Sequence, residues 1–274
     1  MAHRNSTPPP QRVCKAFGAA GAPIQLPGGR ATSWQVGDLV LKRADLDVEQ
    51  LAWQERVLGS LGESAFRVAP PLRAFDGSLL LDGWWAQRRL DGEHRARHWS
   101  EIISVGMRLH EALRGITRPA FLDRRSDPWA IGDRTARGEL PIAAFPEVKH
   151  LDRLTGALRP IPAEPSQVIH GDLTGNVLFA DGLAPAVIDF SPYWRPAVFA
   201  TAIVVGDALL WEGAGEELAR EHLGAPAFAQ CLLRALIYRA VTDRLVRRAE
   251  QWRHDDDDPF AVAVEIACRL AARG

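Results

Sequence analysis

The sequence is poor in cysteine, in lysine and in long apolar runs. Its three cysteines, Cys14, Cys231 and Cys268, stand alone without metal-type or redox spacing, which argues against a disulfide framework or a zinc site. No apolar run approaches the roughly 18 residues of a membrane span, and the first residues are polar rather than an apolar leader. The chain is therefore expected to be cytoplasmic.

The sequence also lacks an excess of charge of either sign. The net charge of −1 at pH 7 argues against nucleic acid or an anionic membrane as the main partner. Hydrophobic residues make up 47% and charged residues 24%, as in an ordinary globular protein with a core large enough to fold alone. A length of 274 residues predicts one large domain or two lobes.

Lysine is the rarest of the basic residues. Of the 33 lysines and arginines, only Lys15, Lys42 and Lys149 are lysines. Lys42 ends the apolar segment LVLK (39–42), which the flanking turns predict to be a strand. A functional ammonium group at this strand is one interpretation, and a strand-end lysine that reaches into solvent is the other.

The order of the predicted elements indicates two lobes. Residues 1–22, which begin with a polar, proline-rich stretch, are expected to form a disordered tail. Residues 23–90 alternate between short strands and turns and carry one amphipathic helix over 47–61. Residues 91–274 are mainly helical, apart from short strands over 167–190. The sequence predicts an α+β fold with a small antiparallel β-rich N-terminal lobe and a larger, mainly helical C-terminal lobe.

Two short segments of the C-terminal lobe carry the most specific polar pattern. The segments VIHGDLTGNVLF (168–179) and AVIDF (186–190) predict two strands joined by an Asp-Gly turn. Such a hairpin brings Asp172, Asn176 and Asp189 to one edge. Magnesium takes carboxylate and amide oxygens while it keeps water and phosphate ligands, and a remaining carboxylate accepts a proton from an attacking hydroxyl. This division of roles is the one that phosphoryl transfer needs.

The paired motifs resemble those of the aminoglycoside phosphotransferase and choline kinase-like family, which are small-molecule relatives of the protein kinases. The phrases HGDLTGNVLF and IDFSPYWRP are similar to those of one bacterial subgroup of this family. The resemblance implies a bilobal protein-kinase-like fold and transfer of the γ-phosphoryl group of ATP to a small-molecule hydroxyl, with Mg2+. It also implies that Asp172 is catalytic, that His170 orients the catalytic loop, and that Asn176 and Asp189 bind the metal.

The same resemblance assigns roles in the N-terminal lobe. Lys42 is expected to hold the α- and β-phosphates of ATP, a task that suits a compact ammonium group. The linker over 87–90 is expected to contact adenine through its backbone, and Gly28 and Gly29 lie where a loop would cover the nucleotide. The helical partner of Lys42 is expected to be Glu55, with Glu49 and Gln54 as alternatives.

The catalytic loop departs from the family pattern in length. Three residues, rather than the usual four, separate Asp172 from Asn176, so the loop must be tighter, and Gly175 permits such a turn. The segment after Asp189 is Phe-Ser-Pro rather than a glycine-containing sequence. The altered motifs leave two other functions open: a catalytically degraded, kinase-like binding protein, and an adenylyltransferase that releases pyrophosphate.

The acceptor is not fixed by the motifs. The loop-rich stretch over 115–145, which would line the acceptor site, carries five arginines against four acidic residues. That balance does not favour a polycationic aminoglycoside, and a neutral or anionic hydroxyl compound fits at least as well. Trp129 and Trp194, expected in loops near the site, are candidates for stacking on the acceptor.

Overall fold

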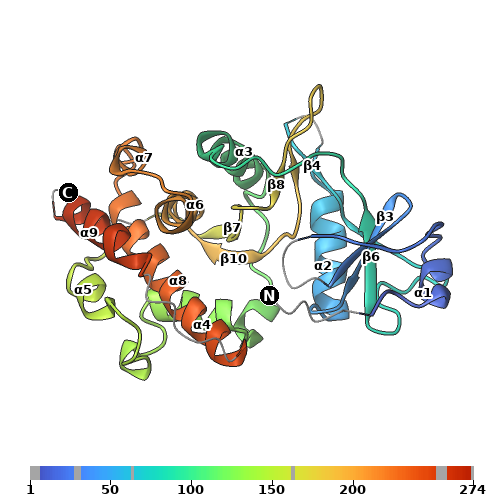
Figure 1. The fold of residues 1–274 in the computed structure, drawn as a ribbon, viewed down its shortest axis with the longest axis horizontal. Helices are drawn as coiled ribbons and strands as arrows, with labels where there is room; N and C mark the ends of the chain where they lie inside the picture. Colours follow the sequence, from blue (N-terminus) through green and yellow to red (C-terminus); the bar gives the residue numbers. More distant parts are fainter. Residues whose placement is uncertain (1–6, 28–31, 63–64, 162–163, 251–257, 273–274) are drawn as a thin grey trace. The chain divides into compact units, whose positions relative to one another are not determined.

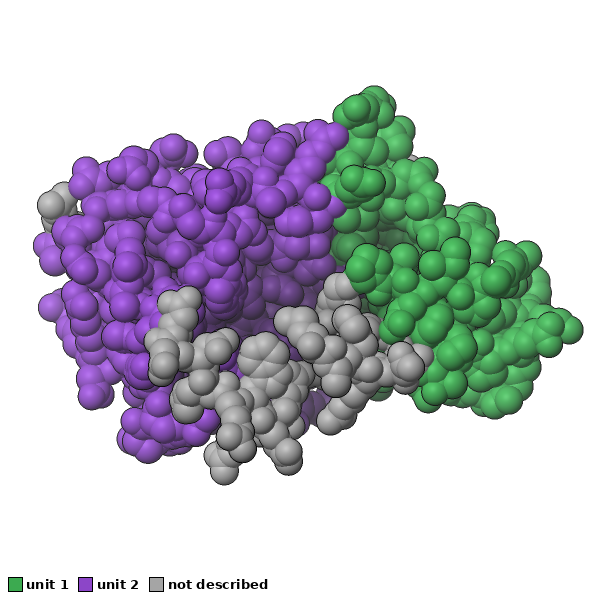
Figure 2. All heavy atoms as spheres, in the orientation of Figure 1, with its two compact units in different colours: residues 1–93, 178–188 green, residues 94–177, 189–274 purple. Residues whose placement is uncertain are grey.

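The structure, a computed structural model, describes residues 7–27, 32–62, 65–161, 164–250 and 258–272. The chain forms two compact units (Figure 2): unit 1 holds residues 1–93 and 178–188, and unit 2 holds residues 94–177 and 189–274. The predicted division into a β-rich and a helical part is confirmed. The return of residues 178–188 to unit 1 differs from the expectation that 91–274 form one lobe.

Unit 1 is built on a five-stranded sheet with the strand order β1-β2-β3-β6-β5. All neighbouring strands in it are antiparallel. The predicted turn at residues 37–38 joins β2 to β3. The strands are β1 (Ile24–Gln25), β2 (Ser33–Val36), β3 (Leu39–Arg43), β5 (Pro71–Leu72) and β6 (Trp84–Arg88).

Each face of this sheet packs against its own helix, because successive strand residues point to opposite sides. On one face, Leu41 and Trp84 form a core with Val13 of α1 (Gln11–Ala16). On the other face, Trp85 packs with Leu51 of α2 (Val48–Gly59). Figure 1 shows α1 and α2 on opposite sides of β3 and β6.

The disordered tail expected over residues 1–22 is wrong for the part that the structure describes. Helix α1 begins at Gln11, directly after the prolines, and Val13, Cys14 and Phe17 are buried. These apolar side chains share one face of the helix and are covered by the sheet, and their burial outweighs the polar composition of the preceding stretch. Pro10 is compatible with this position because the first turn of a helix does not need its N–H.

A second, smaller sheet ties the returning segment to unit 1. It has the order β4-β9-β8, formed by β4 (Arg67–Val68), β9 (Ala186–Val187) and β8 (Val177–Leu178). Strands β4 and β9 are parallel, and Nε of Arg67 donates to the carbonyl of Ala184 at 2.7 Å. The predicted hairpin is therefore present, and its tip belongs to the β-rich unit.

Unit 2 combines a two-stranded ribbon with helices. Strand β7 (Gln167–His170) pairs antiparallel with β10 (Pro192–Arg195), in a register that sets His170 opposite Pro192. No helix in the described part of the chain is long and apolar enough to cross a membrane. The helices of the unit are α3 (Trp99–Ala112), η1 (Ala120–Arg124), α4 (Pro128–Ala136), η2 (Ile142–Ala144), α5 (Leu151–Gly156), α6 (Ala197–Trp211), α7 (Glu216–Arg220), α8 (Phe228–Glu250) and α9 (Phe260–Ala271).

Helices α6 and α8 form the centre of unit 2. Helix α6 is apolar on nearly all sides and buried along most of its length, as expected for a helix that neighbours enclose. Helix α8 packs against both α6 and α4. Part of the stretch expected to be loop-rich thus forms a helix, α4, which begins where Asp127 accepts the N–H of Ala130 and Pro128 occupies the first turn.

Candidate active site

The turn that follows β7 carries the HGD motif. Gly171 lies against the ring of Tyr193 on β10, and a Cβ atom at this position would approach that ring to 2.4 Å. Its N–H donates to the carbonyl of Ser191 at 3.0 Å. A side chain at residue 171 would push the two strands apart, so glycine is required for the close packing that sets the direction of Asp172.

His170 orients this turn from the protein interior. Its side chain is completely buried, its Nδ1 accepts the N–H of Asp172 at 3.2 Å, and its ring meets Phe190 edge-on at 5.5 Å. Nε2 of His110 on α3 accepts the N–H of His170 at 3.1 Å. Burial, with the neighbouring His170, lowers the pKa of His110 to about 3. The His110 ring therefore stays neutral and continues to accept the hydrogen bond from the N–H of His170. Both histidines thereby hold the backbone that precedes Asp172.

The short loop from Asp172 to Asn176 closes as a turn. The N–H of Asn176 donates to the carbonyl of Leu173 at 2.9 Å, and Gly175 has a φ of +78°, a left-handed conformation that favours glycine. The side-chain amide of Asn176 donates to the carbonyl of Asp172 at 2.7 Å. The three-residue spacing therefore still returns Asn176 to Asp172, and Gly175 supplies the conformation that the shorter loop needs.

Asp189 lies next to the same turn. It follows β9 in an exposed position with a φ of 50°, a conformation that non-glycine residues adopt at some cost. The residues after it, Phe190 and Ser191, make the contacts with His170 and Gly171 described above. The structure thus brings Asp189 and the HGD turn together within unit 2. Backbone strain of this kind is often concentrated at functional sites.

A buried ion pair stands behind Asp172. Asp207 is the one charged residue of α6. Its carboxylate accepts hydrogen bonds from Nε and Nη2 of Arg239 on α8, both at 2.6 Å. The same Nη2 donates to Oδ1 of Asp172 at 2.8 Å. Arg239 was not identified from the sequence as part of this site. The available signal was an arginine inside the apolar stretch over 235–241.

Lys42 lies on the face of the unit 1 sheet that packs against α2. It pairs in register with Trp85, and its ammonium nitrogen lies 5.2 Å from the centre of that ring. The side chain is buried, and burial lowers the pKa of Lys42 to about 8, opposed by the charge of Asp45. The solvent-directed lysine considered from sequence is therefore not what the structure contains.

The helical residues considered as partners of Lys42 have different surroundings. Both oxygens of Glu55 accept hydrogen bonds from Arg73, at 2.6 and 2.7 Å. Gln54 is 3% exposed, and α2 thus turns Gln54 rather than Glu55 toward the interior.

Gly28 and Gly29 lie outside the described residues. In the segment expected to contact adenine, Gln87 is buried in β6 and the N–H of Arg89 donates to the carbonyl of Asp38.

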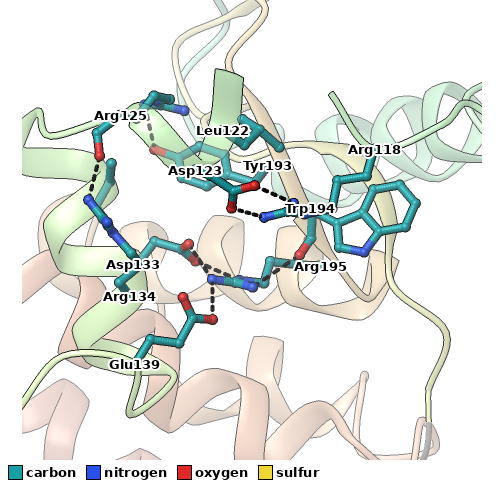
Figure 3. A pocket seen from close by; sticks show the side chains of 11 residues that line it. Arg118, Leu122, Asp123, Arg125, Asp133, Arg134, Glu139, Tyr193, Trp194 and Arg195 are labelled. Atoms are coloured by element: carbon teal, nitrogen blue, oxygen red, sulfur yellow. Dashed lines mark hydrogen bonds and ion pairs between the residues drawn. The ribbon is translucent and has the colours of Figure 1, made fainter. Parts of the chain in front are cut away.

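A pocket in unit 2 is lined by η1, α4 and β10 (Figure 3). Its acidic side chains are all paired with arginines. Asp123 accepts a hydrogen bond from Arg118 at 2.8 Å. Asp133 and Glu139 both form ion pairs with Arg195, at 2.7 and 3.0 Å. The pocket is therefore polar, with charges of both signs that are largely neutralised within its own wall.

Tyr193 connects this pocket to the HGD turn. Its ring packs on Gly171, and it also lines the pocket, where the guanidinium of Arg125 lies 4.8 Å from the ring centre. Trp194, the next residue of β10, contributes its indole to the pocket wall (Figure 3). Trp129 and Trp194 belong to α4 and β10 rather than to loops, and Trp194 is one of the residues that line the pocket.

Three solved structures of small-molecule kinases have a fold similar to that of this chain. Choline kinase LicA from Streptococcus pneumoniae has a TM-score of 0.60 at 10% identity, covering 96% of this chain and 98% of that one. Amicoumacin kinase hAmiN, in complex with AMP-PNP, Ca2+ and Ami, has a TM-score of 0.59 at 14% identity, with coverages of 99% and 95%. A thermostable mutant of aminoglycoside phosphotransferase APH(4)-Ia with ADP and hygromycin B gives 0.57 at 16% identity, with coverages of 96% and 98%. These likenesses confirm the predicted protein-kinase-like α+β fold.

Sequence comparison gives the family itself. A search of curated proteins finds no match. The model of the phosphotransferase enzyme family matches residues 25–193, a segment that contains Lys42, the HGD turn and Asp189. Because this match spans more than half of the 274 residues, the chain belongs to the phosphotransferase enzyme family.

Proposed function

We propose that the protein transfers the γ-phosphoryl group of ATP to a hydroxyl group of a small molecule. The observation that carries this proposal is the convergence of Asn176 and Arg239 on Asp172, at a turn held from behind by His170. In this mechanism Asp172 accepts or orients the proton of the attacking hydroxyl. The protein contributes mainly by positioning the reactants and neutralising charge.

The donor set beside Asp172 fits a hard divalent cation. The side-chain nitrogen of Asn176 donates to the Asp172 carbonyl, an orientation that would leave the amide oxygen to bind the metal. Asp189 supplies an exposed carboxylate. Amide and carboxylate oxygens are ligands that magnesium prefers, and magnesium would neutralise the charge of the β- and γ-phosphates. The complexes of hAmiN with AMP-PNP and Ca2+, and of APH(4)-Ia with ADP, support a nucleotide and a divalent metal here as well.

The pocket beside Tyr193 favours an acceptor that is not a polycation. A polycationic acceptor needs carboxylates free to pair with it, but Asp123, Asp133 and Glu139 are already paired with arginines of the same wall. Drawing Asp123 away would cost Arg118 this ion pair, and drawing Asp133 or Glu139 away would remove one of the two carboxylates that pair with Arg195. A neutral or mixed-charge hydroxyl compound, with a flat or apolar face to lie against Trp194, fits these side chains better.

The first test is a thermal-shift titration with ATP, with and without magnesium. At about 100 times Kd, ATP is expected to stabilise the wild type by about 2.7 kcal/mol, which is a readable shift in Tm. Lys42→Ala and Asp189→Asn are expected to lose the magnesium-dependent part of this shift. Lys149→Ala removes an exposed lysine and is the matched control that keeps it.

Product analysis separates the proposal from its alternatives. Turnover of magnesium-ATP should release ADP, whereas release of pyrophosphate would indicate adenylyl transfer instead. A shift that is indifferent to magnesium and to Asp189→Asn, with no turnover, would contradict the proposal and favour a kinase-like binding protein.

The buried ammonium group of Lys42 makes nucleotide binding depend on pH. With its pKa at about 8, Lys42 loses its charge as the pH rises past that value, and the attraction for phosphate is lost. ATP affinity is therefore expected to fall by about tenfold between pH 7 and pH 9, measured by calorimetry at constant magnesium.

Protein stability should follow the opposite trend over this range. Because the unfolded chain binds the Lys42 proton more tightly, the free energy of unfolding receives a contribution from Lys42 that rises from about pH 8 to 10.5. The weaker ATP binding expected at pH 9 therefore does not come from a loss of protein stability when Lys42 is deprotonated. Lys42→Arg, whose guanidinium stays charged, should flatten the affinity profile, and an unchanged slope in that variant would refute the assignment.

A further inference from the structure

Arg239 is a buried arginine whose guanidinium contacts Asp172, the proton acceptor of the proposed function. Its side chain is 7% exposed, and the Asp207 side chain with which it pairs is 1% exposed. The two come from α8 and α6, helices that pack directly on each other. Burial alone works to lower the pKa of Arg239, but the charges of Asp207, Tyr238 and Asp172 outweigh it and raise that pKa well above its usual value. The guanidinium therefore stays charged.

The geometry of the pair fixes the plane of the guanidinium. Nε and Nη2 donate to the two oxygens of Asp207, which is the bidentate arrangement that planar guanidinium and carboxylate groups favour. The ring centres of Tyr238 and Trp211 lie 4.9 and 5.7 Å from the guanidinium carbon of Arg239. With one edge locked on Asp207, the second hydrogen of Nη2 has one direction available, and it leads to Asp172.

The contact with Asp172 acts on the carboxylate itself. Oδ1 accepts Nη2 of Arg239 at 2.8 Å, and Oδ2 lies 3.4 Å from the side-chain nitrogen of Asn176. Asp172 is one-third exposed, so its carboxylate would otherwise rotate in contact with solvent. Arg239 holds one oxygen in place and leaves the other directed toward the loop.

We propose that Arg239 is a positioning residue for phosphoryl transfer, which fixes the Asp172 carboxylate through the buried Asp207–Arg239 pair. This inference rests on the proposed function and adds a residue from α8 to the residues that hold Asp172 in place. Because its contact is with Asp172, removing it should affect the chemical step rather than nucleotide binding.

The test uses Arg239→Lys, which keeps the positive charge for Asp207 but cannot donate to both carboxylates in the same geometry. Magnesium-ATP turnover is measured as ADP release, with water as the acceptor, alongside Tm with and without magnesium-ADP. Arg239→Lys is expected to lower kcat by about 10- to 100-fold while the KM for ATP stays within about twofold. The matched control is Arg234→Lys on the same helix, whose guanidinium bonds Gln230 and the carbonyl of Arg159 instead.

A double-substitution cycle shows whether Arg239 acts through Asp172. If it does, Arg239→Lys should cause little further loss of kcat in an Asp172→Asn background, and the changes in Tm of the two substitutions should not add. Equal losses of kcat in both backgrounds, an unchanged kcat in Arg239→Lys, or strictly additive Tm changes would overturn the proposal. Wild-type protein without magnesium-ATP turnover would overturn the proposed function separately, since the Tm cycle reports the Arg239–Asp172 contact without any activity.

Discussion

Replacing Asp172 with asparagine is expected to slow magnesium-ATP turnover by about 10²- to 10⁴-fold, the range attributed to a positioned acid–base group. The substitution keeps the shape of the side chain and its place beside Asn176 and Arg239, but removes the charge that, in the proposed mechanism, accepts or orients the hydroxyl proton. The measurement is the steady-state rate of ADP release at saturating ATP.

Nucleotide binding serves as the control for this variant. Because the contacts of Asp172 are with Asn176 of its own loop and with Arg239, the magnesium-ATP thermal shift of Asp172→Asn should match that of the wild type. A variant that binds ATP normally but turns it over at more than a tenth of the wild-type rate would show that Asp172 does not participate in the chemical step.

Replacing Asp207 with alanine should have the largest effect on stability. Asp207 is the buried partner of Arg239, and its removal leaves a charged guanidinium in the interior without compensation. Breaking a buried pair from one side costs about 3–5 kcal/mol. For a chain of this size that corresponds to a fall in Tm of roughly 6–20 °C, measured by calorimetry or circular dichroism.

An ion pair on the surface of α8 provides the comparison. Asp243 pairs with Arg247 one turn away, with each side chain about one-third exposed. Asp243→Ala should cost no more than about 1 kcal/mol, because solvent screens such pairs. Similar losses of Tm in both variants would mean that the Asp207–Arg239 pair is not buried as described.

The parts of the site that are local in sequence could be predicted from it. The HGD turn, Asn176 and Asp189 lie within 20 residues and are joined by short strands, so the chain itself keeps them together. The shorter loop was also interpretable, because a glycine stood at the one place where a left-handed conformation is needed. Lys42 was identified by its rarity and by the apolar strand that it ends.

Contacts between distant segments could not be predicted in the same way. Arg239 lies 67 residues beyond Asp172, and its role depends on the packing angle between α6 and α8, which composition does not specify. Helix α1 was missed because only the sheet that it covers makes its apolar face stable. The outward direction of Glu55 follows from the rotation of α2, where a shift of one residue turns a side chain by about 100°.

The return of residues 178–188 to unit 1 makes that unit discontinuous in sequence. A fragment ending at residue 93 would carry β4 without its parallel neighbour β9 and would lack the Ala184 carbonyl that accepts the hydrogen bond from Nε of Arg67. The covalent crossings at 177–178 and 188–189 lie directly beside Asn176 and Asp189. The β-rich unit therefore completes its fold with the same stretch of chain that delivers these two residues, and a cut in this hairpin should damage both at once.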